Sequence, residues 1–144
     1  MRLHSEGVRK SMNIVPVTTG AAAVQSGGDL DMSGFKGVYF EHVIGNSTTV
    51  VTLIAQGSDS TTAGTFQAIS SASAASTISN SNKILGIDLW MPQFRYVRCT
   101  LQSTGLLNNG GGVIATQYAP TRLPTTHNST DLGASIVQVK YGTT

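Results

Sequence analysis

Hydrophobic and polar positions alternate with a period of two along most of this chain, the spacing of strands that bury one face. In the segment after residue 36, Val38 and Phe40 share one face while Tyr39 and Glu41 share the other. The same pattern predicts seven strands in all, over Asn13–Val17, Gly37–Val43, Thr49–Gln56, Ile84–Trp90, Tyr96–Gln102, Val113–Tyr118 and Ile136–Lys140. In the third of these, apolar residues fall on both faces, so we expect both to be at least partly covered.

Turn-forming residues separate the predicted strands, at Gly27-Gly28, Gly45-Asn46, Gly57-Ser58-Asp59 and Asn108–Gly112. We expect the last of these turns to close a hairpin between the strand around Cys99 and the strand Val113–Tyr118. The length of 144 residues is that of a single domain with a substantial core. The chain is therefore predicted to be all-β, an antiparallel β-sandwich or jelly roll.

The segment Ser70–Asn82 breaks the pattern, because it is rich in Ser, Ala and Asn and has no period. We predict a long loop, with a short helix over Ala72–Ala75 as the alternative, although Ser disfavours helix interiors. Loops of this length are often functional, so this one is a candidate outward-facing or contact loop.

Composition changes this picture of a plain sandwich in one respect. Charged residues are 11% of the chain, less than half of the usual ~25%. Hydroxyl side chains and 16 glycines take their place. Such a surface has little electrostatic repulsion to keep copies apart. It is typical of a protein that packs against others or works outside cells.

The small net positive charge lies at the N-terminus, where Arg2, Arg9 and Lys10 outnumber Glu6 and the remainder of the chain is close to neutral. This excludes the broad basic face that nucleic-acid binding requires. We predict an N-terminal arm over residues 1–12 and a sandwich domain over residues 13–144. The arm either docks on an acidic partner surface or is a solvated tail.

Cys99 is the only cysteine, so the sequence holds no internal disulfide and no paired-cysteine metal motif. Its strand face also carries Val97 and Leu101, which predicts a small buried hydrophobe and not a reactive thiol. The apolar run Thr18–Val24 is too short for a signal peptide and follows Pro16. We therefore expect the chain to be made in a reducing cytoplasm.

Motifs for metal binding or catalysis are missing from the sequence. His4, His42 and His127 lie far apart, without the spacings of metal ligands, and His42 is predicted to be structural. No nucleophile elbow, P-loop or dinucleotide fingerprint occurs. We expect no cofactor and no enzymatic activity.

The acidic residues have structural interpretations. Asp29 and Asp31 flank Leu30 without a third nearby ligand for Ca²⁺, which favours a turn or an Asx cap. Asp88 lies in the middle of a predicted strand, and we expect it to pair with Arg95 or Arg98 on a neighbouring strand.

An ordered set of segments carries a family resemblance: Ile14–Val17, Asp31–Phe40, Gly45, Ala55–Gly57, Ile87–Arg98, Ile114–Tyr118 and Arg122–Pro124. Together they cover most of the chain and resemble a family of small virion proteins of tailed bacteriophages. Such proteins commonly begin near the position of Met12, so Met1–Ser11 is an extension relative to the family.

The resemblance implies a structural protein of the phage particle, of the head decoration (cement) type. Such proteins sit on the outer surface of the head, often as homotrimers, and bridge neighbouring subunits of the major capsid protein. The implied partners are therefore the major capsid protein and further copies of this chain, with no direct contact to nucleic acid or membrane. The implied location is the head surface of the virion.

Six residues are candidates for contacts with the capsid: Arg2, Arg9, Lys10, Trp90, Met91 and Phe94. In this picture the three cations reach an acidic patch on an adjacent capsid subunit. The three apolar side chains surround Pro92 and form a corner that is either core or an intersubunit contact.

Two alternatives remain open. The protein could belong to the neck or tail of the particle, as an adaptor, stopper or tube subunit in a ring. It could also be a carbohydrate-binding adhesion module, which would line a groove with exposed aromatic rings. Aromatic residues make up only 6% of the chain and most fall on predicted core faces, so this alternative ranks third.

Overall fold

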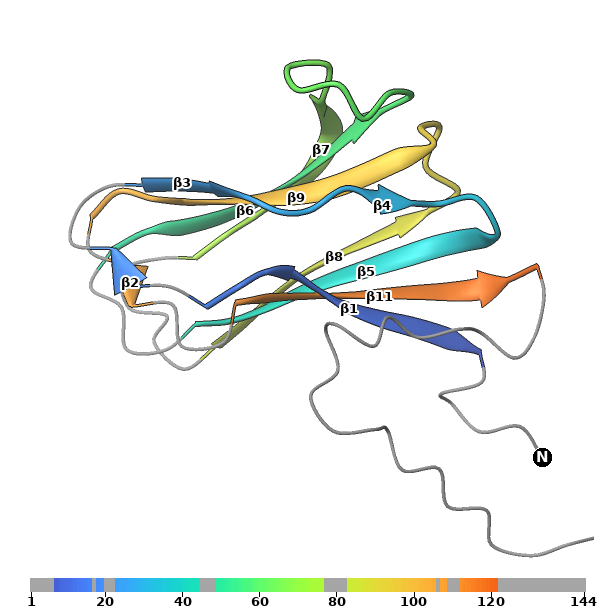
Figure 1. Cartoon of the computed structure of the whole chain (residues 1–144). Coiled ribbons are helices and arrows are strands. Elements are labelled where there is room, and N and C mark those ends of the chain that lie inside the picture. The colour runs from blue at the N-terminus through green and yellow to red at the C-terminus, as the bar shows by residue number, and fades with distance from the viewer. Residues whose placement is uncertain are drawn as a thin grey trace, which may run out of the picture.

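The computed structural model describes residues 7–16, 18–19, 23–44, 49–76, 83–105, 107–108 and 112–121. These residues contain no helix and form two antiparallel sheets that pack face to face (Figure 1). The predicted all-β sandwich is confirmed.

Each sheet is named here after its most central long strand. The β5 sheet has the order β1 (Val8–Ile14), β11 (Val113–Pro120), β5 (Phe35–Ile44) and β8 (Lys83–Trp90). The β9 sheet has the order β3 (Ala23–Ser26), β9 (Tyr96–Ser103), β6 (Val51–Ser58) and β7 (Gln67–Ala75), and β4 (Leu30–Asp31) also pairs with β9. The short strands β2 (Thr18–Thr19) and β10 (Leu107–Asn108) pair with each other.

The core lies between the two sheets and is built by the alternation along the strands. Val38 and Phe40 of β5 point inward and are fully buried, as predicted, and Leu53 meets them from the β9 sheet. Cys99 is buried beside Leu101, which confirms that it is a small core residue. Burial of each large apolar side chain contributes about 1.5–3 kcal/mol, so this interleaved layer is the main source of stability.

The predicted boundary between arm and domain is wrong. The first strand runs over Val8–Ile14 and not over Asn13–Val17, so residue 12 lies inside β1. Backbone pairing with β11, from Val8 opposite Tyr118 to Ile14 opposite Val113, holds this segment in the β5 sheet. The partner strand is about a hundred residues away in the chain, and local pattern carries no information about it.

The predicted loop Ser70–Asn82 is wrong in its first half, and so is the alternative helix over Ala72–Ala75. Residues 67–75 form β7, which pairs with β6. The pairing is irregular, because Ala68 and Ser73 are five positions apart while their partners Gln56 and Ile54 are two apart. Ser71 has a left-handed φ of 62° within this bulge. Residues 77–82 lie outside the described residues.

The predicted hairpin between the Cys99 strand and the Val113 strand is also wrong. β9 pairs with β3, β4 and β6, whereas β11 pairs with β1 and β5. The chain therefore crosses from one sheet to the other between these two strands. The predicted strand Ile136–Lys140 lies outside the part of the chain that the structure describes.

A buried amide joins the two sheets at one side of the sandwich. Asn13 of β1 accepts hydrogen bonds at Oδ1 from the backbone N–H and the Sγ of Cys99, both at 3.0 Å, and donates from Nδ2 to the Gly28 carbonyl at 2.6 Å. On the neighbouring strand, Gln117 Nε2 donates to the carbonyl of Asp31 at 2.8 Å. These bonds connect β1 and β11 to the opposite sheet.

Asn13→Ala should lower the free energy of unfolding by about 1–3 kcal/mol, because it leaves the buried N–H of Cys99 without its acceptor. Urea denaturation followed by circular dichroism measures the change. Gln102→Ala, at an exposed position of β9, is the matched control and should change stability little. Equal stability of the two variants would contradict the bridging role of Asn13.

His42 is a structural histidine, as predicted. Its side chain is 1% exposed, and Nδ1 lies 2.7 Å from the carbonyl oxygen of Gly112. A carbonyl only accepts, so Nδ1 carries the proton and donates. Burial lowers the pKa of the imidazole below its ordinary 6.5, and the hydrogen bond to Gly112 opposes this shift only in part.

This shift predicts a pH dependence of stability. Below pH 6.5 the unfolded chain binds a proton at His42 that the folded chain does not bind, so stability should decrease as pH falls from 7.5 to 5.5. The slope for one proton is at most about 1.4 kcal/mol per pH unit. Urea unfolding of the wild type and of His42→Asn measures it, and an unchanged slope in the variant would exclude His42 as the cause.

Candidate binding surface

Large apolar side chains are exposed at several positions of the described surface, namely Met12, Val15, Val24, Val43, Ile84, Trp90 and Met91. All of them except Val24 belong to the β5 sheet or directly follow one of its strands, and they divide into two groups, one toward each end of β8. We call the group at its C-terminal end the aromatic corner (Asp88, Trp90, Met91 and Tyr118) and the group at its N-terminal end the apolar patch (Met12, Val43, Ile84 and Ile114).

The aromatic corner is built around a stacked pair of rings. Trp90 and Tyr118 lie with ring centroids 5.9 Å apart and an interplanar angle of 21°. They come from β8 and β11, and Gly37 of β5 is the register partner of both. A Cβ at Gly37 would collide with the ring of Tyr118. Glycine at this position therefore lets the ring lie flat across the sheet, and Gly86 does the same for Tyr39.

A hydrogen bond fixes the orientation of the pair. The hydroxyl of Tyr118 donates to Oδ1 of Asp88 at 2.5 Å. Burial, together with the neighbouring carboxylate, raises the pKa of Tyr118 to about 12, so the hydroxyl remains a donor at neutral pH. Since Asp88 and Trp90 lie on the same face of β8, both stacked rings are tied to one strand.

The backbone is strained directly after each ring. Met91 has a φ of 49° and Ala119 a φ of 51°, the left-handed region that residues with a Cβ rarely adopt. The N–H of Met91 donates to the carbonyl of Lys36 at 2.6 Å, which holds the turn. Conformations of this kind cost of order 1–3 kcal/mol and cluster at functional sites. Two of them beside one stacked pair mark the corner as a candidate site.

A groove runs beside the corner, between the edge strands β7 and β8. It consists of two adjoining hollows of about 470 and 400 Å³, which share Ile69, Ser70, Leu89 and Trp90 in their walls. The first hollow adds Ser71, Ser73 and Asp88, and the second adds the segment Met91–Phe94. We call this the β7–β8 groove. Serines of β7 line one wall, and Trp90 lies with Leu89 in the wall that β8 forms.

The apolar patch lies at the other end of the same sheet face. Val43 and Ile84 are direct cross-strand partners, and Ile84 is 63% exposed. Met12 and Ile114 are partners on the strands β1 and β11. Lys10 lies two residues before Met12 on the same face of β1, and Glu41 of β5 is the register partner of Ile114 on that face, so one cation and one carboxylate adjoin the patch.

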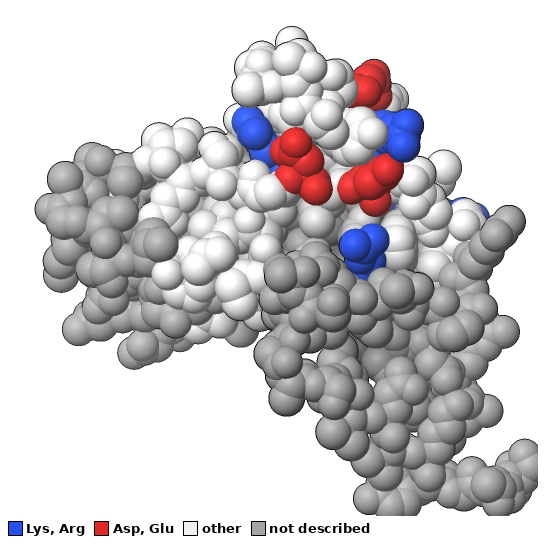
Figure 2. All heavy atoms as spheres, viewed as in Figure 1, with Lys and Arg blue, Asp and Glu red and all other residues white. Residues whose placement is uncertain are grey.

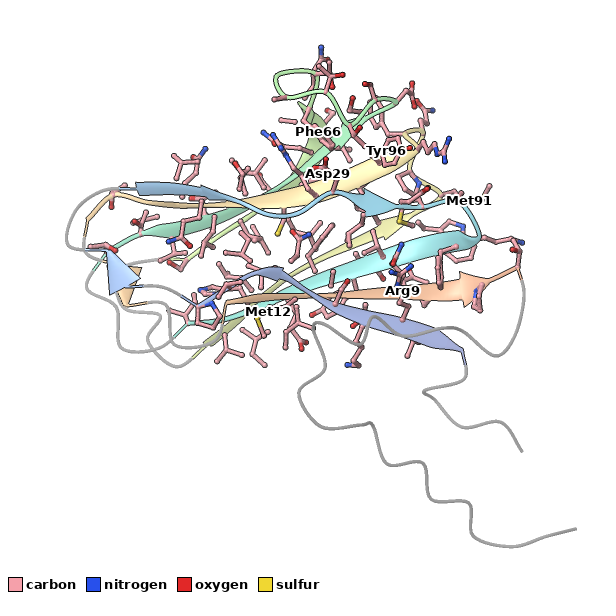
Figure 3. The ribbon with its side chains drawn as sticks, in the orientation of Figure 1. Arg9, Met12, Asp29, Phe66, Met91 and Tyr96 are labelled. Carbon is pink, nitrogen blue, oxygen red and sulfur yellow. The ribbon has the colours of Figure 1, made fainter. Side chains whose placement is uncertain are left out.

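The structure separates the residues that the sequence predicted for the capsid contact. Arg2 lies outside the described residues. Lys10 is on the outer face, whereas Arg9 pairs in register with the inward-facing Gln117, and its Nε is buried without a partner (Figure 3).

For the apolar corner, the interpretation as core is wrong for Trp90 and Met91, which are 58% and 63% exposed. It is right in part for Phe94, which is half-buried, packs against the core and covers Gly57. The alternative, that the corner makes intersubunit contacts, stays a prediction.

The acidic residues have other partners than predicted. Arg95 pairs with Asp31 at 3.1 Å and Arg98 lies 3.8 Å from Asp29, so the predicted pairing of Asp88 with either arginine is wrong. Asp31 also accepts a hydrogen bond from the N–H of Ser33 at 2.9 Å, which confirms the Asx cap. The hydrogen bond from Arg95 holds the pKa of Asp31 below its ordinary value.

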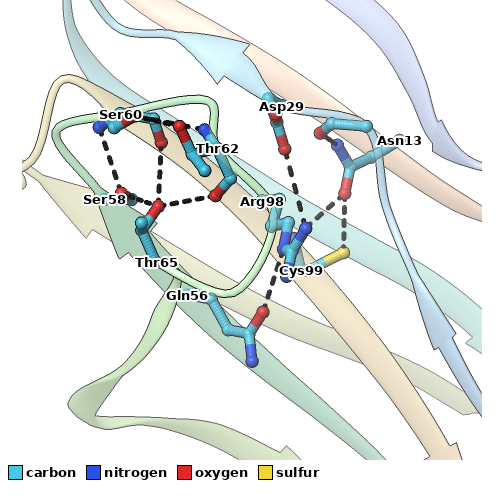
Figure 4. A network of polar contacts seen from close by, with 10 residues as sticks. Asn13, Asp29, Gln56, Ser58, Ser60, Thr62, Thr65, Arg98 and Cys99 are labelled. Atoms are coloured by element: carbon cyan, nitrogen blue, oxygen red, sulfur yellow. Dashed lines mark hydrogen bonds and ion pairs between the residues drawn. The ribbon is translucent and has the colours of Figure 1, made fainter.

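These ion pairs form one zone of mixed charge. Figure 2 shows acidic and basic side chains next to each other in one part of the visible surface, and mostly uncharged side chains elsewhere among the described residues. Arg98 also donates to Oε1 of Gln56 at 2.9 Å, and the nearby β6–β7 connection is held by hydroxyl bonds such as Ser58 to Thr65 at 2.7 Å (Figure 4). Because the four side chains of these two ion pairs neutralise one another, they offer no strong field to a ligand.

Sequence reasoning missed the partners of Trp90. The outward alternation of Tyr39 against Val38 and Phe40 was visible, and Tyr118 follows the same pattern on its own strand. What the sequence could not show is that β8, β5 and β11 are neighbours. Only that pairing brings Tyr118 and Trp90 together over Gly37.

Within the described ranges, no three His, Cys, Asp or Glu side chains lie close enough together to hold a metal ion. The same residues include no helix of the length and apolarity needed to cross a membrane. Comparison of the chain with models of protein families and with curated proteins finds no match.

Gly37→Ala should disrupt the aromatic corner, because the new Cβ has no room under the ring of Tyr118. We expect a loss of about 1–3 kcal/mol in stability and a shift of tryptophan emission to longer wavelength as Trp90 loses its stacked neighbour. Trp90 is the only tryptophan, so emission reports on this site alone. Gly28→Ala, where a Cβ meets nothing within 4 Å, is the control. Identical spectra for both variants would show that Gly37 does not position the ring pair.

Proposed function

We propose that this protein is a non-enzymatic structural protein of a tailed-phage particle, a decoration (cement) protein that binds the outer surface of the assembled head and bridges capsid subunits. The family resemblance along the chain supports the class of protein. The observation that carries the proposal is the apolar patch, which four strands of one rigid sheet present to solvent beside Lys10.

The chemistry of the patch suits a protein partner. A contiguous group of exposed aliphatic side chains and Met is the usual centre of a protein interface, and a polar surround completes it. Ile84 and Val43 supply the apolar centre, while Lys10 and Glu41 add one charge of each sign to the polar surround. The surrounding surface carries hydroxyls and few charges, so little desolvation cost opposes close packing.

The mechanism is stabilisation by mass action. A protein that binds the assembled lattice and not free subunits shifts the equilibrium toward the lattice. If copies also associate with one another, as a homotrimer would, several weak patches engage together and the avidity exceeds the affinity of one patch. In this proposal the partners are the major capsid protein and further copies of this chain.

Purified particles provide the first test. The wild-type chain should be present in hundreds of copies, near one per major capsid subunit, by quantitative mass spectrometry. Six to a few dozen copies would instead assign it to the neck or tail, and absence from particles would reject a virion role.

Ile84→Asp tests the patch itself. The buried carboxylate would be unpaired in the interface, so occupancy on particles that lack the wild-type chain should fall by about tenfold or more. Val24→Asp is the matched control, because Val24 is 64% exposed, as Ile84 is at 63%, but lies in the β9 sheet. Both variants should keep the melting temperature of the wild type. If both variants lost occupancy to the same extent, or if neither lost it, the patch would not be the docking surface.

A further inference from the structure

We propose that the β7–β8 groove is a binding site for a neutral oligosaccharide, with one sugar ring packed on the open face of Trp90. The proposal goes beyond the structural role, since it concerns the opposite end of the sheet from the apolar patch. It rests on the ring pair, on the chemistry of the groove walls and on charge.

Trp90 has the geometry of a stacking platform. One face of its indole packs on Tyr118, yet the side chain is 58% exposed, and it lines both hollows of the groove. The stack, the hydrogen bond from Tyr118 to Asp88 and the glycine beneath fix the ring before any ligand arrives. A ligand therefore gains contact with an ordered ring without the entropic cost of ordering it.

The walls match the two kinds of surface on a sugar. A pyranose has a face of C–H groups, which packs on an aromatic ring, and a rim of hydroxyls, which needs hydrogen-bond partners. Ser70, Ser71 and Ser73 on β7 and Asp88 on β8 line the same hollow as Trp90. Each hollow, at about 470 and 400 Å³, has the size of a small-molecule site.

Charge selects among sugars. Asp88 is the one charged residue among the described residues that line the groove, and it is negative. Acidic sugars would meet an unfavourable field in a partly desolvated site, whereas neutral sugars can donate hydroxyl protons to the carboxylate. The ligand class is thus neutral oligosaccharides.

A peptide strand fits the β7 side of the groove less well. An added strand needs a regular free edge, and β7 is interrupted by a bulge at which Ser71 has a left-handed φ. Bulges of this type protect sheet edges from pairing with other chains. A ligand held by side chains suits this edge better than one held by a backbone ladder.

The test uses the full-length protein and isothermal titration with trisaccharides of glucose, galactose and N-acetylglucosamine, while Trp90 emission reports on the site. We expect at least one neutral sugar to bind with a Kd of about 0.1–1 mM and to change the emission, and trigalacturonate to bind at least about tenfold more weakly than galactotriose or not at all. Trp90→Ala should weaken binding about tenfold or more, while Trp90→Phe, which keeps a ring, should retain part of it.

Ile84→Asp is the control for this site, because it alters the apolar patch and should leave sugar affinity unchanged. The capsid contact is proposed at the other end of the sheet and not at this corner, so Trp90→Ala should keep its occupancy on particles, in contrast to the prediction of an intersubunit contact from the sequence. Failure of this proposal and failure of the capsid role are then separate results. Two outcomes would overturn the sugar site. One is the absence of binding to any neutral glycan of a printed array. The other is a Trp90→Ala variant that keeps sugar affinity or loses its place on particles, which would make the corner a capsid contact.

Discussion

The arrangement of the sandwich depends on the side chain of Asn13. Both of its polar atoms are satisfied by the opposite sheet, through Cys99 and Gly28, so β1 is joined to the β9 sheet by hydrogen bonds as well as by apolar contact. Such a buried amide is costly unless every bond is made, which restricts how the two sheets can be placed. On the opposite side, the groove lies between β7 and β8.

A single sheet face carries two different surfaces. The apolar patch and the aromatic corner lie at opposite ends of β8, with Ile84 and Trp90 six residues and thus about 20 Å apart. A partner that covers one end leaves the other accessible. In the proposed arrangement the patch meets the capsid while the groove faces the surroundings of the particle. The low charge of the chain serves both surfaces, since neither requires a strong field.

Much of the fold was predictable, because alternation reports directly on burial. The pattern of Val38 and Phe40 against Tyr39 and Glu41 identified β5 and its faces, and the same reasoning identified the burial of Cys99. β7 was not predictable, because a run of Ser and Ala has neither period nor propensity for a strand. This segment becomes a strand because β6 offers it an unpaired edge. The predicted start of β1 was wrong for the same reason, because the hydrogen bonds that make residues 8–12 a strand come from β11.

For the candidate site, the sequence by itself determined that Trp90, Met91 and Phe94 form an apolar corner, that the chain is poor in charge, and that it builds a sandwich. These are local or compositional properties. Only the tertiary structure decided that Trp90 is exposed and that Tyr118 stacks on it over Gly37. It also decided that the side chains of Arg9 and Lys10 lie on opposite faces of β1. The physical reason is that sheet pairing joins segments far apart in the chain. Which side chains become neighbours on a face depends on strand order and register, and neither is encoded in any local pattern.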